Sequence, residues 1–257
     1  AARELGLPKT YGNWEDVIQD PSVDAVLIGA WPYMHCPVTL AALDAGKHVL
    51  TQARMAMNAR EAQRMLDRAR EATGQAAMVV PSPYGLAGEA FVRSLIADGF
   101  LGTLREVHVD GLAGDLADPS TPMGWRQKTR YSGFNMLTLG ILHETVSRWV
   151  PPARRVLAYA SKLVPERFDP ESNRTKAVGT PDSVQVLTTH EDGSVGTYRL
   201  SAVLWGGRSM GVALHGSEGS LFYDLLTDEV RGVRRGEDAP RALPIPDGLR
   251  GGWRVEA

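Results

Sequence analysis

Gln52 and Arg54 are the residues of this sequence whose types and positions best suit chemistry. They follow the apolar run His48–Thr51, which is typical of a short buried strand. Arginine stays protonated near neutral pH and offers a planar fork of donors to a carboxylate or an oxyanion, although it cannot serve there as a general base. A cation just beyond a strand therefore suits an anchor for such a group. The alternative is a structural salt bridge to a carboxylate such as Glu144.

A strand–helix–strand unit must position these two residues. Asp24–Gly29 is a nearly continuous apolar run, and the segment Pro37–Ala45, closed by Gly46, predicts a helix before the strand His48–Thr51. Two strands joined through a helix run parallel, and open α/β sheets bind ligands beyond the carboxyl ends of their strands. We therefore expect a ligand site at Ala30-Trp31-Pro32 and at Gln52-Ala53-Arg54.

The rest of the chain predicts two architectures. Asn58 suits the N-cap of a helix from Ala59 to about Ala72, with Glu61 completing a capping box, and Ala76–Val80 follows as a third buried strand. Beyond residue 102, long β runs separated by hairpin-like turns predict a predominantly antiparallel sheet. The further helices expected are Leu86–Asp98 and Phe134–Trp149, and the later strands expected are Leu104–Gly111, Arg155–Lys162, Ser183–His190, Ser194–Leu204, Ser209–His215 and Ser220–Tyr223.

These elements predict an α/β fold followed by an α+β fold, with a boundary near Leu101. Residues 1–101 are expected to form a partial Rossmann-like domain, and residues 102–257 an α/β domain with an open, C-terminally incomplete sheet. The family resemblance given below implies that the first is a dinucleotide-binding domain and the second a substrate-binding and oligomerisation domain. The sequence has no initiating Met and no G-x-G-x-x-G, so we expect an internal piece of a longer protein. A genuinely shortened homologue is the alternative.

Composition narrows the function classes. The 257 residues are 43% apolar and 23% charged, with a net charge of −2, which gives no electrostatic reason to expect nucleic acid or a membrane surface. No apolar run approaches the ~20 residues that span a bilayer. Cys36 is the one cysteine, which fits the reducing cytoplasm. The histidines are scattered singly, so we expect no metal site.

The stretch Trp31–Val49, WPYMHCPVTLAALDAGKHV, resembles the glucose–fructose oxidoreductase/inositol dehydrogenase (Gfo/Idh/MocA) family. That family carries a His and a Pro just before a helix, then AALxAGKHV, and then Glu-Lys-Pro. His35, Pro37 and the AALDAGKHV segment match, whereas Gln52-Ala53-Arg54 replaces Glu-Lys-Pro. Ala53 thus takes the place of a lysine that, in the family, lies beside the nicotinamide and the substrate hydroxyl.

The resemblance implies a cofactor and a set of residues near it. NAD or NADP is expected, and the residues expected to contact it are Ala30, Trp31, Pro32, His35 and Gln52. Trp31 replaces a residue that is usually small or Pro. Its side chain is therefore expected either to line the nicotinamide site or to occupy part of the space that the nicotinamide would fill. His35 has a second interpretation, as a residue that only caps the helix behind the site.

The resemblance also implies a substrate site for a sugar or polyol. The family often has Trp-Arg where Trp125-Arg126 stands, and Tyr131 lies in the same loop; the alternative is a loop anchored by one buried aromatic. In the family's glycine-rich helix, Asp, His and Asp share one face, and here these positions fall on Thr138, Leu142 and Thr145. The substrate-binding residues expected are Trp125, Arg126, Tyr131, Asn135, Thr138 and Glu144.

His143 lies one residue beyond the position of the family's histidine, which is ~100° around a helix. We include it with Gln52 and Arg54 as a catalytic candidate, with a hydrogen-bonded helix residue as the alternative. The function expected is NAD(P)-dependent oxidation or reduction of a secondary hydroxyl without the usual Lys, Asp and His, in a homodimer or higher homo-oligomer that associates through the open sheet. The alternatives are a redox-neutral lyase or hydratase acting on an oxidised sugar, and a non-catalytic binding or partner subunit.

Overall fold

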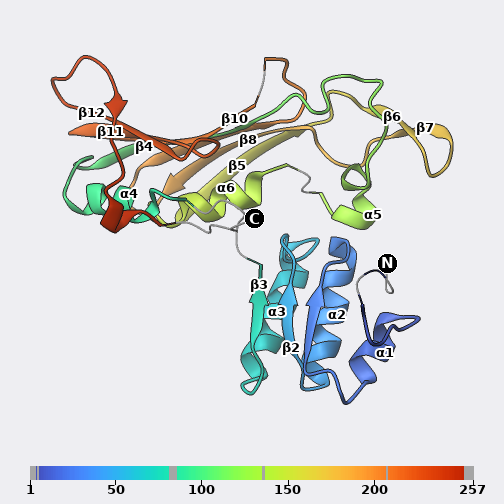
Figure 1. Cartoon of the computed structure of the whole chain (residues 1–257). Coiled ribbons are helices and arrows are strands. Elements are labelled where there is room, and N and C mark those ends of the chain that lie inside the picture. The colour runs from blue at the N-terminus through green and yellow to red at the C-terminus, as the bar shows by residue number, and fades with distance from the viewer. Residues whose placement is uncertain (1–3, 5, 81–85, 135–136, 207, 252–257) are drawn as a thin grey trace. The chain divides into compact units, whose positions relative to one another are not determined.

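The computed structural model describes residues 4, 6–80, 86–134, 137–206 and 208–251. The chain divides into two compact units (Figure 1). The first contains Ala1–Pro81 and Lys128–Phe134, and the second contains Ser82–Gln127 and Asn135–Ala257. The predicted boundary near Leu101 concerns domains that fold independently, and it stays a prediction.

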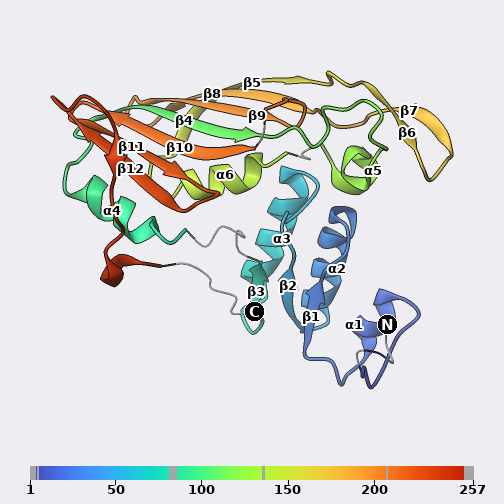
Figure 2. The same ribbon diagram turned by 45° about the horizontal axis from the view of Figure 1, so that its top comes forward.

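The first unit is built on a parallel sheet of three strands in the order β1-β2-β3. Helices α2 and α3 pack against each other (Figures 1 and 2), and apolar residues of β1, β2 and α2 form a shared core. The predicted parallel strand–helix–strand unit is therefore confirmed. Its elements are α1 (Trp14–Gln19), β1 (Ala25–Ile28), α2 (Pro32–Asp44), β2 (His48–Thr51), α3 (Ala59–Glu71), β3 (Ala77–Val79) and α5 (Thr129–Ser132).

Helix α2 begins five residues earlier than the sequence predicts. Pro32 occupies its first turn, where the fixed φ of proline favours a helix and its missing N–H costs nothing. Pro37, which we expected to open the helix, lies inside it. His35 is consequently a buried helical residue rather than part of a loop before the helix.

Asn58 caps α3 as predicted. Its Oδ1 accepts a hydrogen bond from the backbone N–H of Glu61 at 3.0 Å, and the Glu61 carboxylate accepts one from the N–H of Met57 at 3.1 Å. The reciprocal bond thus reaches one residue further back than in a standard capping box. Both bonds fix the chain at the start of α3, directly after the segment that follows β2.

Lys47, in the segment that resembles the family, has a structural role. Its side chain is 7% exposed, and its ammonium donates to the carbonyl oxygens of Asp20 at 2.8 Å and Val23 at 2.6 Å. Hydrogen bonds from a charged donor contribute ~1.5–3 kcal/mol each before the cost of burying the charge. The lysine therefore fixes the turn that leads into β1.

Lys47→Met is expected to lower the free energy of unfolding by about 2 kcal/mol, because two carbonyl groups lose their donor while the apolar stem is kept. Urea unfolding followed by circular dichroism measures this change. Lys162→Met, at an exposed position of the other unit, is the control and should change the unfolding free energy by less than about 0.5 kcal/mol. Equal effects of the two variants would contradict this role for Lys47.

The second unit contains a mixed sheet of eight strands in the order β13-β12-β11-β10-β4-β9-β8-β5. The β4–β9 pair is parallel and the other neighbours are antiparallel, as expected for a predominantly antiparallel sheet. Its helices and strands are α4 (Glu89–Ala97), β4 (Leu104–Leu112), α6 (Leu139–Val146), β5 (Ala153–Ser161), β6 (Glu166–Asp169), β7 (Arg174–Ala177), β8 (Ser183–His190), β9 (Val195–Ser201), β10 (Ser209–Gly216), β11 (Gly219–Asp224), β12 (Glu229–Arg234) and β13 (Arg241–Ala242), with short 3₁₀ turns at Trp125–Gln127 and Asp247–Leu249.

Helices α4 and α6 cover one face of this sheet (Figure 1). Val107 and Val109 of β4 point to the helices and are fully buried, whereas Glu106, His108 and Asp110 alternate to the opposite face. No helix of the described residues packs on that face in Figure 1. The open sheet expected from the sequence is therefore present.

Helix α6 is shorter than the predicted helix Phe134–Trp149. Its last regular residue is Val146, because the backbone N–H groups of Arg148 and Trp149 bond three residues back, to Thr145 and Val146, and so tighten the final turn. At the other end, Gly133 has a φ of +65°, which ends the separate short helix α5. Asn135 lies outside the described residues.

The hairpin of β6 and β7 was missed. Its inward residues are polar: Arg167 and Asp169 are both buried, so β6 shows none of the apolar alternation that predicts a strand. Asp169 forms an ion pair with Lys176 at 3.2 Å. An analysis of hydrophobic periodicity cannot detect a strand whose buried face is charged.

Candidate functional site

The carboxyl ends of β1 and β2 expose Ala30, Trp31 and Gln52 in the first unit. The backbone N–H of Gln52 still bonds to the carbonyl oxygen of Ile28 at 3.0 Å, so the sheet fixes its position while its side chain meets solvent. Pro32 is buried under this surface. These residues form a ledge where parallel sheets bind ligands.

His35 ties the two strand ends together. Its imidazole is buried, with Nδ1 2.7 Å from the carbonyl oxygen of Arg54 and Nε2 2.9 Å from that of Ala30. Because both ring nitrogens face backbone oxygens, the side chain can influence a ligand only through the two segments that it holds. This geometry matches the capping interpretation of His35.

Arg54 reaches the short helix α5 within the same unit. Its Nη1 donates to the carbonyl oxygen of Ser132 at 2.8 Å. Gly133, the next residue, approaches the segment after β2 so closely that a Cβ atom there would lie 2.3 Å from the carbonyl oxygen of Met57. Only glycine fits this contact, so Arg54 and Gly133 together pack α5 against the residues that follow β2.

Three aromatic residues gather beside the ledge. The rings of Trp31 and Tyr131 have centroids 4.5 Å apart, those of Tyr33 and Tyr131 are 5.8 Å apart, and the Arg130 guanidinium lies 4.4 Å from the centre of the Tyr131 ring. Tyr131, expected to contact substrate together with Trp125 and Arg126, thus packs against a residue expected to contact the cofactor.

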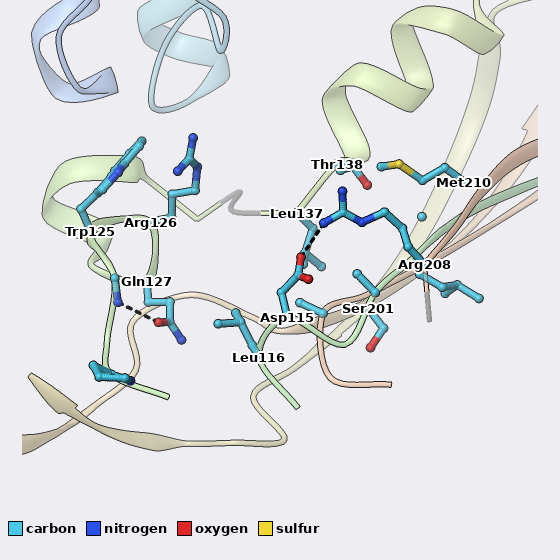
Figure 3. A pocket seen from close by; sticks show the side chains of 16 residues that line it. Asp115, Leu116, Trp125, Arg126, Gln127, Leu137, Thr138, Ser201, Arg208 and Met210 are labelled. Carbon is cyan, nitrogen blue, oxygen red and sulfur yellow. Dashed lines mark hydrogen bonds and ion pairs between the residues drawn. The ribbon is translucent and has the colours of Figure 1, made fainter. Parts of the chain in front are cut away.

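The second unit has a pocket of its own, of about 420 Å³ (Figure 3). The end of β4, the loop that follows it, the start of α6 and the segment before β10 supply its lining. We call this the second-unit pocket. Trp125, Arg126 and Thr138 line it, so three of the six predicted substrate-binding residues come together there.

Trp125 and Arg126 stack on each other, with the guanidinium carbon of Arg126 4.3 Å from the indole centre. One face of the indole is therefore covered by the arginine. Gln127 is buried next to them, and its Oε1 accepts a hydrogen bond from the N–H of Gly124 at 3.0 Å. The hydrogen bond of Gln127 therefore holds the loop that contains Trp125, in addition to the aromatic residue itself.

Arg167, which the sequence did not single out, anchors the other part of this loop. Its side chain is 1% exposed, and its guanidinium donates to the carbonyl oxygens of Asp118 at 2.8 Å, Thr121 at 3.0 Å, and Leu116. Leu116 lines the second-unit pocket. A buried cation that binds three carbonyl groups therefore shapes one wall of the pocket.

The α6 residues matched to the family's acidic and histidine positions differ in environment. Thr138 precedes the helix and lines the pocket, whereas Leu142 is fully buried in the core. Thr145 is buried too, and its hydroxyl donates to the carbonyl oxygen of Ile141 at 3.1 Å. One of the three positions thus faces the pocket.

Glu144 and His143 lie outside the pocket lining. The Glu144 carboxylate accepts a 2.9 Å hydrogen bond from Nε of Arg148, which also pairs with Glu89 at 2.6 Å. His143 is exposed, with Nδ1 3.1 Å from the hydroxyl of the buried Tyr198. Burial raises the pKa of Tyr198 to about 12, so the phenol keeps its proton and can donate to His143.

The pocket contains residues that the sequence analysis did not select. Asp115, Ser201 and Arg208 lie far apart in the chain and share no spacing that would connect them. Within the described part of the chain, no group of three or more His, Cys, Asp or Glu residues is arranged to hold a metal ion. The described helices include none long and apolar enough to cross a membrane.

The chain thus contains a parallel sheet of three strands in one unit and an open mixed sheet of eight strands in the other. Two family models match the chain: "Oxidoreductase family, NAD-binding Rossmann fold" over residues 1–80 and "GFO/IDH/MocA C-terminal domain" over residues 90–222. The second alone covers more than half of the chain. The chain belongs to the Gfo/Idh/MocA family.

Two relatives and one solved structure illustrate the similarity. An uncharacterized oxidoreductase of Synechocystis sp. is 29% identical over 237 residues, covering 91% of this chain and 64% of the relative. The levoglucosan dehydrogenase of Pseudarthrobacter phenanthrenivorans is 24% identical over 289 residues, covering 100% of this chain and 72% of the relative. A structure of levoglucosan dehydrogenase in complex with NADH and L-sorbose superimposes with a TM-score of 0.82 at 22% identity, covering 94% of this chain and 66% of that chain. This chain thus spans slightly less than two thirds of the Synechocystis relative.

Proposed function

We propose that the whole protein is an NAD(P)-dependent oxidoreductase that acts on a secondary hydroxyl of a sugar or polyol. The observation that carries the proposal is the occurrence, in one chain, of a match to the NAD-binding Rossmann model and a match to the family's C-terminal domain, which contains the second-unit pocket. Levoglucosan dehydrogenase, with NADH and L-sorbose in its structure, gives a chemical precedent.

The exposed ledge of the first unit fits the nicotinamide part of the cofactor. Ala30 and Trp31 offer an apolar surface, Gln52 offers an amide that hydrogen-bonds a carboxamide or a hydroxyl, and all three are exposed beyond the strand ends. The bound dinucleotide would supply the hydride acceptor. His35 would keep the two strand ends in place beneath it.

The second-unit pocket fits a polyhydroxylated ligand. Its volume of about 420 Å³ lies within the usual range for small-molecule sites. Thr138 and Ser201 offer hydroxyl groups and Arg126 offers charged donors, while Leu112, Leu137 and Met210 supply apolar walls. A few polar groups within a mostly apolar lining are the usual arrangement for recognising hydroxyl groups.

Proton transfer is the part of the reaction that this chain supports least. Ala53 stands at the lysine position and has no group that can polarise or deprotonate a hydroxyl, and Leu142 is buried at the histidine position. Gln52, Arg54 and His143 remain candidates for binding or polarising the reacting oxygen. We therefore propose that oxidation is slow, because general acid–base groups contribute ~10²–10⁴-fold.

The same two residues, Ala53 and Leu142, favour a second candidate function. A redox-neutral lyase or hydratase, or a binding subunit without catalysis, needs the pocket but not the lysine–histidine pair. Detectable hydride transfer to the cofactor distinguishes the oxidoreductase from both alternatives.

We also propose a homodimer that forms through the open face of the second unit's sheet, in the cytoplasm. Leu157 and Tyr159 of β5 and Leu187 of β8, which pairs with Leu157, lie on that face and are all exposed. Apolar groups in such a row are stabilised when a second copy covers them.

A calorimetric titration with NAD and NADP tests the cofactor proposal. The natural full-length protein should bind one of them, whereas these 257 residues alone should not bind either tightly, because they contain no glycine-rich loop to donate N–H groups to the pyrophosphate. Micromolar binding by the 257 residues would contradict the second expectation. No binding by the full-length protein would reject the oxidoreductase.

A further inference from the structure

Asp115 and Arg208 form an ion pair at the second-unit pocket (Figure 3). The Nη2 of Arg208 donates to Oδ2 of Asp115 at 2.8 Å. Asp115 comes from the loop after β4, and Arg208 from the segment before β10, so the pair connects two walls of the pocket. Their side chains are 67% and 54% exposed, and an ion pair this exposed contributes little to stability.

The pair uses only part of the arginine's hydrogen-bonding capacity. A guanidinium has five N–H groups, and among the described residues the bond to Asp115 is the one that Arg208 makes. The pair of Arg199 and Asp110 on the open face differs, since Nε and Nη2 bind both carboxylate oxygens at 2.7 and 2.6 Å. Arg208, a lining residue of the pocket, therefore has N–H groups that the bond to Asp115 does not use, whereas Nε and Nη2 of Arg199 are both bound to Asp110.

The charges of the lining favour an anion. Among the lining residues, Arg126 and Arg208 are positive and Asp115 is the single acid. A guanidinium binds a carboxylate through two parallel N–H···O bonds, a geometry that a neutral hydroxymethyl group cannot reproduce. Thr138 and Ser201 line the same pocket and can bind hydroxyl groups of the same ligand.

We propose that Arg208 is a carboxylate-binding residue and that the pocket selects a polyhydroxy acid, such as an aldonate or a uronate, over the corresponding neutral sugar or polyol. This inference rests on the proposed function, because it specifies the class of sugar that the pocket takes. Asp115 holds one edge of the guanidinium and leaves the other N–H groups to the ligand carboxylate.

Calorimetric binding to the full-length protein at low ionic strength tests this proposal with two matched probe pairs: D-gluconate with D-glucitol, and D-galacturonate with D-galactose. At least one acid should bind about tenfold or more tightly than its neutral counterpart, since a charge-assisted pair is stronger than a neutral hydrogen bond. Arg208→Ala should remove this preference, and Arg208→Lys should retain part of it. Arg199→Ala, the control on the open face, should leave it unchanged.

The other outcomes of these titrations distinguish failure of the inference from failure of the proposed function. Neutral probes that bind as well as the acids, or an acid preference that survives Arg208→Ala, would overturn the inference and leave the proposed function standing. Acetate that binds as tightly as the preferred acid would also overturn it, because the site would then recognise a bare anion. Absence of binding by all four probes would reject both the inference and the proposed sugar pocket. The unfolding midpoint of each variant confirms that Arg208→Ala acts on binding rather than on folding.

Discussion

Ala53→Lys in the full-length protein is expected to raise kcat/KM for sugar or polyol oxidation by about 10²-fold. The substitution places an ammonium group at the position that the family resemblance assigns to the lysine, on the exposed segment that follows β2. A group that polarises or deprotonates the reacting hydroxyl contributes ~10²–10⁴-fold. We expect the lower end of this range, because Leu142, at the position that the resemblance assigns to the histidine, stays buried. The rate is followed by the absorbance of the reduced nicotinamide.

Gln52→Lys is the matched control, since it introduces the same ammonium group one residue away on the same exposed segment. It should not increase the rate, because adjacent residues of an extended segment point in different directions. Equal gains from the two variants would indicate a general electrostatic effect. An unchanged rate in Ala53→Lys, with cofactor binding retained, would contradict the role given to position 53.

Arg167→Met is expected to have the largest effect on stability, a loss of about 3 kcal/mol or more in the free energy of unfolding. The variant keeps much of the buried volume but leaves three carbonyl groups without their charged donor. Each such bond contributes ~1.5–3 kcal/mol, part of which offsets the cost of burying the guanidinium. Urea unfolding measures the loss.

Arg174→Met on the neighbouring strand β7 is the control, because Arg174 is exposed. It should change the free energy of unfolding by less than about 0.5 kcal/mol. Arg167→Met should also weaken ligand binding in the second-unit pocket, since Leu116 lies in the wall that Arg167 holds. A variant as stable as the control would show that water satisfies these carbonyl groups as well as Arg167 does.

The parts of the fold that sequence alone predicted are those with a local physical signal. The strand His48–Thr51 has the bounds expected from its apolar run, and the helix that Asn58 caps begins at Ala59. The start of α2 was predicted wrongly because two prolines, Pro32 and Pro37, each fit a first helical turn. Only the structure decides between them.

The parts that could not be predicted depend on contacts between distant residues. The β6–β7 hairpin buries Arg167 and Asp169, so its pattern lacks an apolar face. Asp115 and Arg208 come together across 93 positions of the chain, without a motif that relates them. Trp125, Arg126 and Thr138 could be selected only because the chain resembles a family from which substrate residues are expected at these positions.

The turnover of the unmodified full-length protein tests the central proposal most directly. A panel of sugars, polyols and their acids is incubated with NAD and NADP, and reduced nicotinamide is followed by absorbance. We predict measurable oxidation of at least one compound, with kcat well below the ordinary range of ~1–10³ s⁻¹. Turnover within that range would contradict the view that Ala53 leaves the site without its proton-transfer group, and no turnover with a bound cofactor and ligand would contradict the oxidoreductase itself.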